Sequence, residues 1–492
     1  MDASTVSKRM FSGAVWMVCL KLSVRAIGLV STVILARLLI PADFGLVALA
    51  MSFYAILDVL TTFNFDMALI QNQKATRDDY NAAWTMNLLM TIGIAIILLS
   101  SMSYVSDLFN EPRLMYVFPM MAIMSFLEGL TNIGVVDFRK ELELRKEFKY
   151  EVSKKVLAFI VTVSAAIYFR SYWALLTGMV VGQLGGTTLS YIMHPFRPRL
   201  SLKGASALLN FSKWLLMNNV LFFVNTRLMN LIIGSYYPSK VLGHVSVIKD
   251  IAEMTTAELV WPIQRALFPG YSKLTNNPTA LVNNFLGSLS VISFVGVPLA
   301  VMIAFFNEYV VFIILGDQWL EAAWMLRIMC LAGAFNLIGA ATASVFFATG
   351  RPKIVTMIAL FLAVIRLPVF FYFIANKELE AALYTLLVTS ALRTCVSLIT
   401  IGRIHTISLL AMLAPIGRTF LASFITMFAI VSLTQWFPLQ QRVLLDLITV
   451  IGMGLLCSVV YLSMHYLFWY LLAKPKGAET IILNFVKSKL NH

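Results

Sequence analysis

Long apolar runs separated by short polar breaks dominate the 492-residue chain. A helix that crosses the hydrocarbon core of a bilayer needs about 20 mostly apolar residues. Runs of this kind predict an all-α polytopic membrane protein with about 14 transmembrane helices. The predicted spans are residues 13–38, 43–64, 80–102, 114–135, 150–169, 172–193, 208–235, 241–263, 281–305, 322–347, 353–375, 380–401, 412–434 and 443–471.

An internal repeat appears when the chain is overlaid on itself with an offset of 198 residues. Trp16 then falls on Trp214, and Gly45 falls on Gly243. Around these residues the same order recurs in both halves: a long span, a short proline-containing turn and a second span. Two pseudo-symmetric halves are common in transporters, where the substrate path runs between them. The overlay therefore predicts two six-helix lobes followed by two C-terminal helices. The expected divisions are an N-lobe (1–200), a C-lobe (201–405), the last two spans (406–475) and a cytoplasmic tail (476–492).

Composition supports the membrane interpretation. Hydrophobic residues make up 60% of the chain and charged residues 13%, against about 45–50% and about 25% in soluble domains. This excludes a cytosolic enzyme, a nucleic-acid-binding protein and a disordered chain. The predicted loops are too short for a catalytic domain, and no GxGxxG, Walker-type, HExxH or GxSxG motif is present. The four cysteines and five histidines are scattered, so we expect no catalytic residues, no metal site and no cofactor.

Basic residues gather on one side of the predicted membrane topology. The net charge is +14, and the loops on the side of both termini hold 24 Lys and Arg against 5 in the opposite loops. Cytoplasmic loops of membrane proteins carry an excess of Lys and Arg. The asymmetry predicts that both termini are cytoplasmic, and it explains the basic excess without nucleic acid.

Several cations lie within the predicted spans, where they are costly and usually face a cavity or a partner. Lys21 and Arg25 are four residues apart and so share one helical face. A cationic interior suits an anionic substrate such as a phosphate or diphosphate. The alternative is that each cation reaches the interface or pairs with an acid, which is the interpretation favoured for Arg393, near a span end. The candidate substrate-binding residues are Lys21, Arg25, Arg227, Lys249 and Arg366.

Acidic residues within the spans form a second candidate set. A carboxylate inside a membrane can bind a proton or sodium ion and couple its movement to transport. The alternative is salt bridging, for which Lys249 and Glu253 have the i, i+4 spacing. The candidate ion-coupling residues are Asp58, Glu128, Asp250 and Glu253.

The stretch Leu35–Phe53, LARLLIPADFGLVALAMSF, carries a family resemblance. Its pattern L-A-R-x-L-x-P-x-x-F-G resembles the polysaccharide transporter family, the Wzx-type flippases of the multidrug/oligosaccharidyl-lipid/polysaccharide (MOP) superfamily. The segments Ser12–Trp16, Ile70–Gln71 and Ala266–Pro269 are also similar to that family. Within it, the chain most resembles the exporters of the colanic acid and succinoglycan kind.

The resemblance implies a function. Such proteins move undecaprenyl-diphosphate-linked oligosaccharide repeat units across the bacterial inner membrane, for exopolysaccharide or lipopolysaccharide biosynthesis. Related lipid flippases use alternating access through a cationic central cavity with basic residues on the first and eighth spans, where Lys21, Arg25 and Lys249 occupy comparable places. The implied partners are the lipid-linked oligosaccharide, the bilayer, and the polysaccharide polymerase and export machinery.

Three other interpretations remain open. A MATE-like drug or small-molecule antiporter belongs to the same superfamily, but it typically has twelve spans and a pocket for cationic compounds. A membrane polysaccharide polymerase usually needs a sizeable periplasmic loop, and the predicted outside loops are short. The third alternative is a scaffold subunit of a synthesis complex.

Overall fold

The described residues form helices joined by turns, without a strand. A computed structural model describes residues 3–61, 65–72, 74–203, 205, 228–434, 442–472 and 479. The helices are α1 (Ala3–Leu38), α2 (Pro41–Thr61), α3 (Phe65–Gln71), α4 (Arg77–Leu108), α5 (Leu114–Gly129), the 3₁₀ helix η1 (Ile133–Val136), α6 (Asp137–Lys140), α7 (Leu144–Phe169), α8 (Trp173–Met193), α10 (Leu228–Tyr236), α11 (Ser239–Lys273), α12 (Pro278–Phe305), α13 (Asn307–Leu315), the 3₁₀ helix η2 (Asp317–Ala322), α14 (Ala323–Ala348), α15 (Pro352–Ala375), α16 (Leu379–His405), α17 (Leu409–Thr434) and α18 (Val443–Leu471).

Many of these helices are suited to crossing a membrane. Ten helices in the described segments are long and apolar enough, and the count becomes eleven if one bent pair forms a single span. The prediction of an all-α, multi-span membrane protein is therefore confirmed. The count of fourteen stays a prediction. The predicted spans 172–193 and 241–263 are not among these helices, and most of the predicted span 208–235 lies outside the described residues.

The bent pair replaces the predicted straight span 114–135. Helix α5 ends at Gly129, and the chain turns by 69° into η1 and α6. The buried Asn132 organises this turn, because its side-chain oxygen accepts a hydrogen bond from Gly134 N at 3.0 Å. Local side-chain capping of this kind competes with continuation of a helix.

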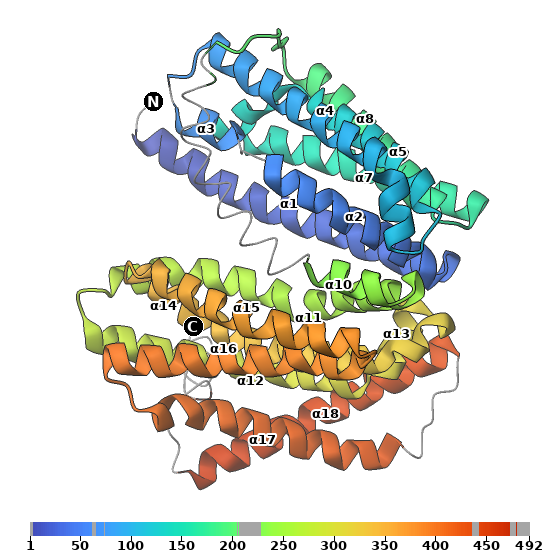
Figure 1. The fold of residues 1–492 in the computed structure, drawn as a ribbon. Coiled ribbons are helices and arrows are strands. Elements are labelled where there is room, and N and C mark those ends of the chain that lie inside the picture. Colours follow the sequence, from blue (N-terminus) through green and yellow to red (C-terminus); the bar gives the residue numbers. More distant parts are fainter. Residues whose placement is uncertain are drawn as a thin grey trace. The chain divides into compact units, whose positions relative to one another are not determined.

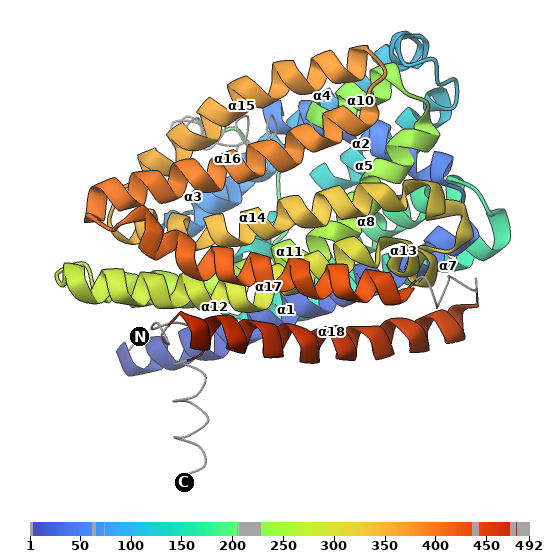
Figure 2. The same ribbon diagram turned by 90° about the horizontal axis from the view of Figure 1, so that it is seen from below.

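The chain divides into two compact units, Met1–Ser246 (unit 1) and Val247–His492 (unit 2). In unit 1, α7 and α8 are adjacent in both views (Figures 1 and 2). Their contact uses glycines four residues apart on α8. A Cβ added at Gly178 would lie 1.7 Å from Thr162 Oγ1, and one at Gly182 would lie 2.6 Å from Ala158 Cβ. Such small-residue spacing lets helices pack closely in a membrane. The predicted lobe boundaries stay predictions.

Helix α2 and the first turns of α11, both in unit 1, make a reciprocal contact. A Cβ added at Gly45 would lie 1.6 Å from Ser239 O, and one at Gly243 would lie 1.8 Å from Pro41 O. Ser239 follows Pro41 by 198 residues, as Gly243 follows Gly45. The two segments therefore approach backbone to backbone at positions that are equivalent in the sequence repeat.

Unit 2 is built around α14. In its most apolar window 78% of the residues are buried, against 17% in α15 and in α18. Helices α12 and α16 pack against α14, and α17 packs against α12 (Figure 2). Large apolar side chains including Phe285, Leu337 and Leu398 form one buried core between these helices. Helix α14 is therefore the central helix of the unit, with α15 and α18 at its periphery.

Candidate functional site

Two arginines lie midway along neighbouring apolar helices of unit 2. Arg366 lies on α15 and Arg393 on α16, close enough for their like charges to interact. Arg393 Nη2 donates a hydrogen bond to Asn336 Oδ1 on α14 at 2.6 Å. The expectation that Arg393 lies near a span end is wrong. Helix α16 continues to His405 and so places Arg393 near its middle.

This arginine pair (Arg366 and Arg393) is suited to an anion. No carboxylate forms an ion pair with Arg393 within the described ranges, and its side chain is exposed. A cation at membrane depth is costly, and such residues mark substrate pathways. A guanidinium presents a planar fork of donors that matches phosphate oxygens. The pair is therefore the candidate phosphate-binding surface of unit 2.

The other predicted cations are found in different surroundings. Lys21 and Arg25 are half-exposed on one face of α1. Lys249 Nζ lies 3.8 Å from Glu253 Oε1, so the predicted i, i+4 pairing is confirmed. Asp250, next to Lys249, is exposed. Arg227 lies outside the described residues.

Two of the predicted coupling acids share one region of unit 1. The buried Tyr54 hydroxyl on α2 donates a hydrogen bond to Glu128 Oε2 on α5 at 3.0 Å. Glu128 itself is exposed, and Asp58 lies one helical turn from Tyr54 on α2. Glu128 is thus an accessible carboxylate within an apolar helix, and its position is fixed by the hydrogen bond from the buried Tyr54 hydroxyl.

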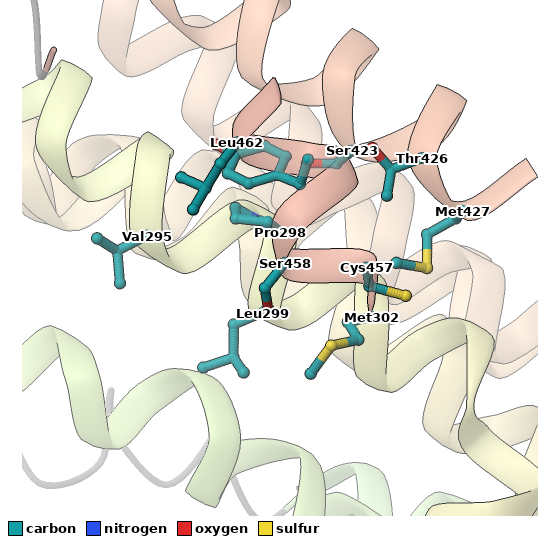
Figure 3. A pocket seen from close by; sticks show the side chains of 11 residues that line it. Val295, Pro298, Leu299, Met302, Ser423, Thr426, Met427, Cys457, Ser458 and Leu462 are labelled. Atoms are coloured by element: carbon teal, nitrogen blue, oxygen red, sulfur yellow. The ribbon is translucent and has the colours of Figure 1, made fainter. Parts of the chain in front are cut away.

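An apolar pocket of about 280 Å³ lies between α12, α17 and α18 in unit 2 (Figure 3). The fully buried Thr426 lines it, and its Oγ1 has no hydrogen-bond partner in the described parts of the chain. The lining is otherwise mostly aliphatic or sulfur-containing, which suits a hydrocarbon chain. The lining residues are Val295, Pro298, Leu299, Met302, Ser423, Thr426, Met427, Cys457, Ser458, Tyr461 and Leu462.

A polar pocket of about 610 Å³ lies in unit 1 where α4 begins and α8 ends. We call it the cation pocket. Sequence reasoning missed it, because its cations lie in short segments that were assigned to loops. Its lining residues are Ala75, Thr76, Arg77, Tyr80, Asp137, Lys140, Glu141, His194, Pro195, Phe196 and Arg197.

Unit 2 contains a buried charged group that was also missed. Arg418 Nη2 lies 2.9 Å and His465 Nε2 lies 2.7 Å from Glu479 Oε1. We call these three residues the sealed cluster, since each is at most 7% exposed. The sequence signals that could have indicated this cluster are Arg418 and His465 within apolar runs and Glu479 near the C-terminus.

Known proteins resemble this chain in sequence and in fold. The family described as "Polysaccharide biosynthesis protein" matches residues 34–324. The lipopolysaccharide biosynthesis protein WzxC of Escherichia coli (strain K12) is 25% identical over 364 residues, covering 71% of this chain and 72% of that protein. The succinoglycan biosynthesis transport protein ExoT of Rhizobium meliloti (strain 1021) is 21% identical over 319 residues, covering 64% and 65%.

A solved structure shares the fold. The inward closed conformation of the lipid II flippase MurJ matches 93% of this chain and 100% of its own, with a TM-score of 0.72 and 14% sequence identity. At this identity the match shows a common fold, since proteins of one fold differ in their functional sites.

Proposed function

Because the chain belongs to the family of polysaccharide biosynthesis proteins, we propose that it is a flippase that moves lipid-linked oligosaccharides between the leaflets of a membrane. The many apolar helices and the fold shared with a lipid flippase support this proposal. The proposed substrate is an undecaprenyl-diphosphate-linked repeat unit, and the proposed setting is the bacterial inner membrane with both termini in the cytoplasm. The chain would move this substrate without covalent change and deliver it to a polysaccharide polymerase.

The observation that carries the proposal is the arginine pair at the middle of α15 and α16. A diphosphate cannot cross hydrocarbon bare, because burying isolated charges costs tens of kcal/mol by Born solvation. Two guanidinium groups at that depth would replace much of its hydration. The 2.6 Å hydrogen bond to Asn336 fixes Arg393 without neutralising its charge. Lys21 and Arg25 would add to this cationic path.

The apolar pocket offers a complementary role. A lipid-linked oligosaccharide carries a long hydrocarbon chain that must stay out of water while its headgroup moves. The aliphatic lining between α12, α17 and α18 would hold a segment of this chain. The polar and apolar parts of the substrate would then contact different helices of the same unit.

The test is flipping of a lipid-diphosphate-linked saccharide by the full chain in proteoliposomes. We expect Arg366→Gln and Arg393→Gln each to slow flipping by about 10–100-fold, since a hydrogen bond to a charged group contributes about 1.5–3 kcal/mol and about 1.4 kcal/mol is tenfold. Arg403→Gln is the matched control, as Arg403 is exposed near the end of the same helix.

The same assay separates the alternatives. Unchanged flipping by the double variant Arg366→Gln/Arg393→Gln would contradict the arginine-pair assignment. Absence of flipping by the wild-type chain, with export of cationic compounds instead, would favour the drug antiporter. Elongation of the saccharide in the vesicles would favour the polymerase.

We propose Glu128 as the coupling acid. It is accessible, it lies in an apolar helix, and Tyr54 orients its carboxylate. Glu128→Gln keeps the hydrogen bond but removes the charge, so flipping should lose its dependence on an imposed proton or sodium gradient. Asp107→Gln, an exposed acid near the end of α4, is the control that should keep this dependence.

A further inference from the structure

Three cations of the cation pocket are positioned by aromatic rings. The Arg77 guanidinium lies 5.8 Å from the Phe196 ring centroid, Lys140 Nζ lies 5.4 Å from that of Tyr80, and the Arg197 guanidinium lies 5.6 Å from that of Tyr191. Among the described residues, none of the three forms an ion pair with a carboxylate. Aromatic rings orient a cation without cancelling its charge. The pocket therefore keeps its positive charge available.

Asp137, one of the two carboxylates that line the pocket, already interacts with Tyr80 and His194. Its Oδ1 accepts a hydrogen bond from the Tyr80 hydroxyl, and its Oδ2 lies 3.4 Å from His194 Nε2. His194 Nδ1 accepts from Phe196 N at 3.2 Å, which assigns the ring proton to Nε2. Asp137 thus holds the pocket wall together, and the lining stays net positive because three cations outnumber the two carboxylates, Asp137 and Glu141.

The wall that follows α8 is rigidly attached. Asn132 Nδ2 donates to Phe196 O at 2.7 Å, and Asn81 Oδ1 accepts from Arg199 N at 2.9 Å. Gly134 lets the segment lie close, since a Cβ there would be 2.2 Å from His194 Nδ1. Preorganised walls reduce the entropy lost on binding.

We propose that the cation pocket binds a phosphorylated saccharide, with Arg77, Lys140 and Arg197 around the phosphate. The exposed Glu141 carboxylate at the rim accepts hydrogen bonds from sugar hydroxyls, and the Phe196 ring lies beside the sugar. The identity of the natural ligand as a lipid-linked saccharide rests on the proposed function. The predicted topology places this end of unit 1 in the cytoplasm, so the pocket would receive the headgroup before translocation.

The test is calorimetric titration of the full chain, purified in a neutral detergent, with glucose 1-phosphate as the probe. The Arg366→Gln/Arg393→Gln variant is the background, so that the arginine pair does not contribute. Glucose 1-phosphate should bind, inorganic phosphate should bind more weakly, and glucose should not bind. Arg77→Gln and Lys140→Gln should each weaken glucose 1-phosphate binding by about tenfold or more.

Lys149→Gln is the matched control. Lys149 is an exposed cation on α7 outside the pocket lining, and its loss should leave binding unchanged. No glucose 1-phosphate binding, or equal binding by all variants, would overturn the site. Phosphate binding as tight as glucose 1-phosphate would overturn the saccharide assignment.

A second measurement distinguishes a saccharide from an anionic membrane lipid. The same titration in phosphatidylcholine and phosphatidylglycerol nanodiscs should give similar affinities for glucose 1-phosphate. Loss of binding only in phosphatidylglycerol would show that a lipid headgroup fills the pocket and would overturn the proposal. Pocket binding that persists while the wild-type chain flips no lipid-linked saccharide would refute the proposed function but leave the site intact.

Discussion

The cation pocket of unit 1 and the sealed cluster of unit 2 use the same residue types in opposite ways. Both combine arginine, histidine and a carboxylate. In the cation pocket the arginines are exposed and lie against rings, whereas in the sealed cluster Arg418 is 7% exposed and paired with Glu479. Access to solvent therefore decides whether a charged side chain is available to a ligand or is paired with another buried side chain and stabilises the fold.

The energetics of the two sites differ for the same reason. Removing one partner of a buried ion pair leaves an uncompensated charge in a low-dielectric environment. Arg418 Nε, His465 Nδ1 and Glu479 Oε2 already lack partners among the described residues, so the contacts to Glu479 Oε1 are the ones that compensate the buried charges. An exposed cation that loses its neighbour is solvated by water instead.

The largest expected effect is that of Glu479→Ala. It should lower the free energy of unfolding by about 3–5 kcal/mol, because Arg418 and His465 would lose their common acceptor while buried. Denaturant-induced unfolding in detergent measures this loss. Glu141→Ala, the same substitution at the rim of the cation pocket, should change stability by less than about 0.5 kcal/mol. Equal effects of the two substitutions would contradict the distinction between the sites.

Gly134→Ala should have the next largest effect. The added Cβ would clash with His194 Nδ1 at 2.2 Å and with Phe196 Cβ at 2.8 Å, and overpacking of this kind costs about 1–3 kcal/mol. Glucose 1-phosphate binding should fall with it, as the pocket wall is displaced. Gly93→Ala in α4 is the control, since no atom lies within 4 Å of its added Cβ. Stability and binding that survive Gly134→Ala would show that the wall is not fixed as described.

The two sites should respond to acid in different pH ranges. Burial lowers the pKa of His194 in the folded chain below its ordinary 6.5. As the pH falls through 6.5, His194 therefore becomes protonated in the unfolded chain before it does so in the folded chain. The free energy of unfolding should then decrease just below pH 6.5, and His194→Gln should remove this decrease. The midpoint of denaturation as a function of pH measures it.

The sealed cluster should lose stability only at lower pH. Burial raises the pKa of Glu479, but hydrogen bonding to His465 and the charge of Arg418 outweigh it and hold this pKa below its ordinary 4.5. Its contribution is therefore complete above pH 4.5 and is lost as the pH falls through the lowered pKa. A single acid transition shared by wild type and His194→Gln would contradict the assignment of the upper range to the pocket.

Arg77→Gln should have the smallest effect on stability. The side chain is exposed and contributes a cation–π contact of about 0.5–1 kcal/mol. The measurement is the same denaturation curve, read beside the titration with glucose 1-phosphate. A loss of stability as large as that of Glu479→Ala would show that Arg77 belongs to the fold instead of to a binding surface.

The sequence by itself determined the helical membrane architecture and one ion pair within a helix. Apolar runs predict spans because a helix in hydrocarbon satisfies its own backbone and must present an apolar surface to lipid. The 198-residue offset made Gly45 equivalent to Gly243, but the contact between the two glycine-containing segments is known only from the structure. The ion pair between Lys249 and Glu253 could also be predicted from the sequence, because the two residues have i, i+4 spacing within one helix.

Tertiary structure alone decided which polar residues of different helices meet. Arg366 and Arg393 lie close together because α15 and α16 pack side by side. Glu479 lies beside Arg418 although 61 positions separate them. The cation pocket combines residues from the start of α4, from α6 and from the segment after α8. Periodicity records only which residues share a face of their own helix. Which faces then converge depends on close packing between helices distant in sequence, and no local pattern encodes it.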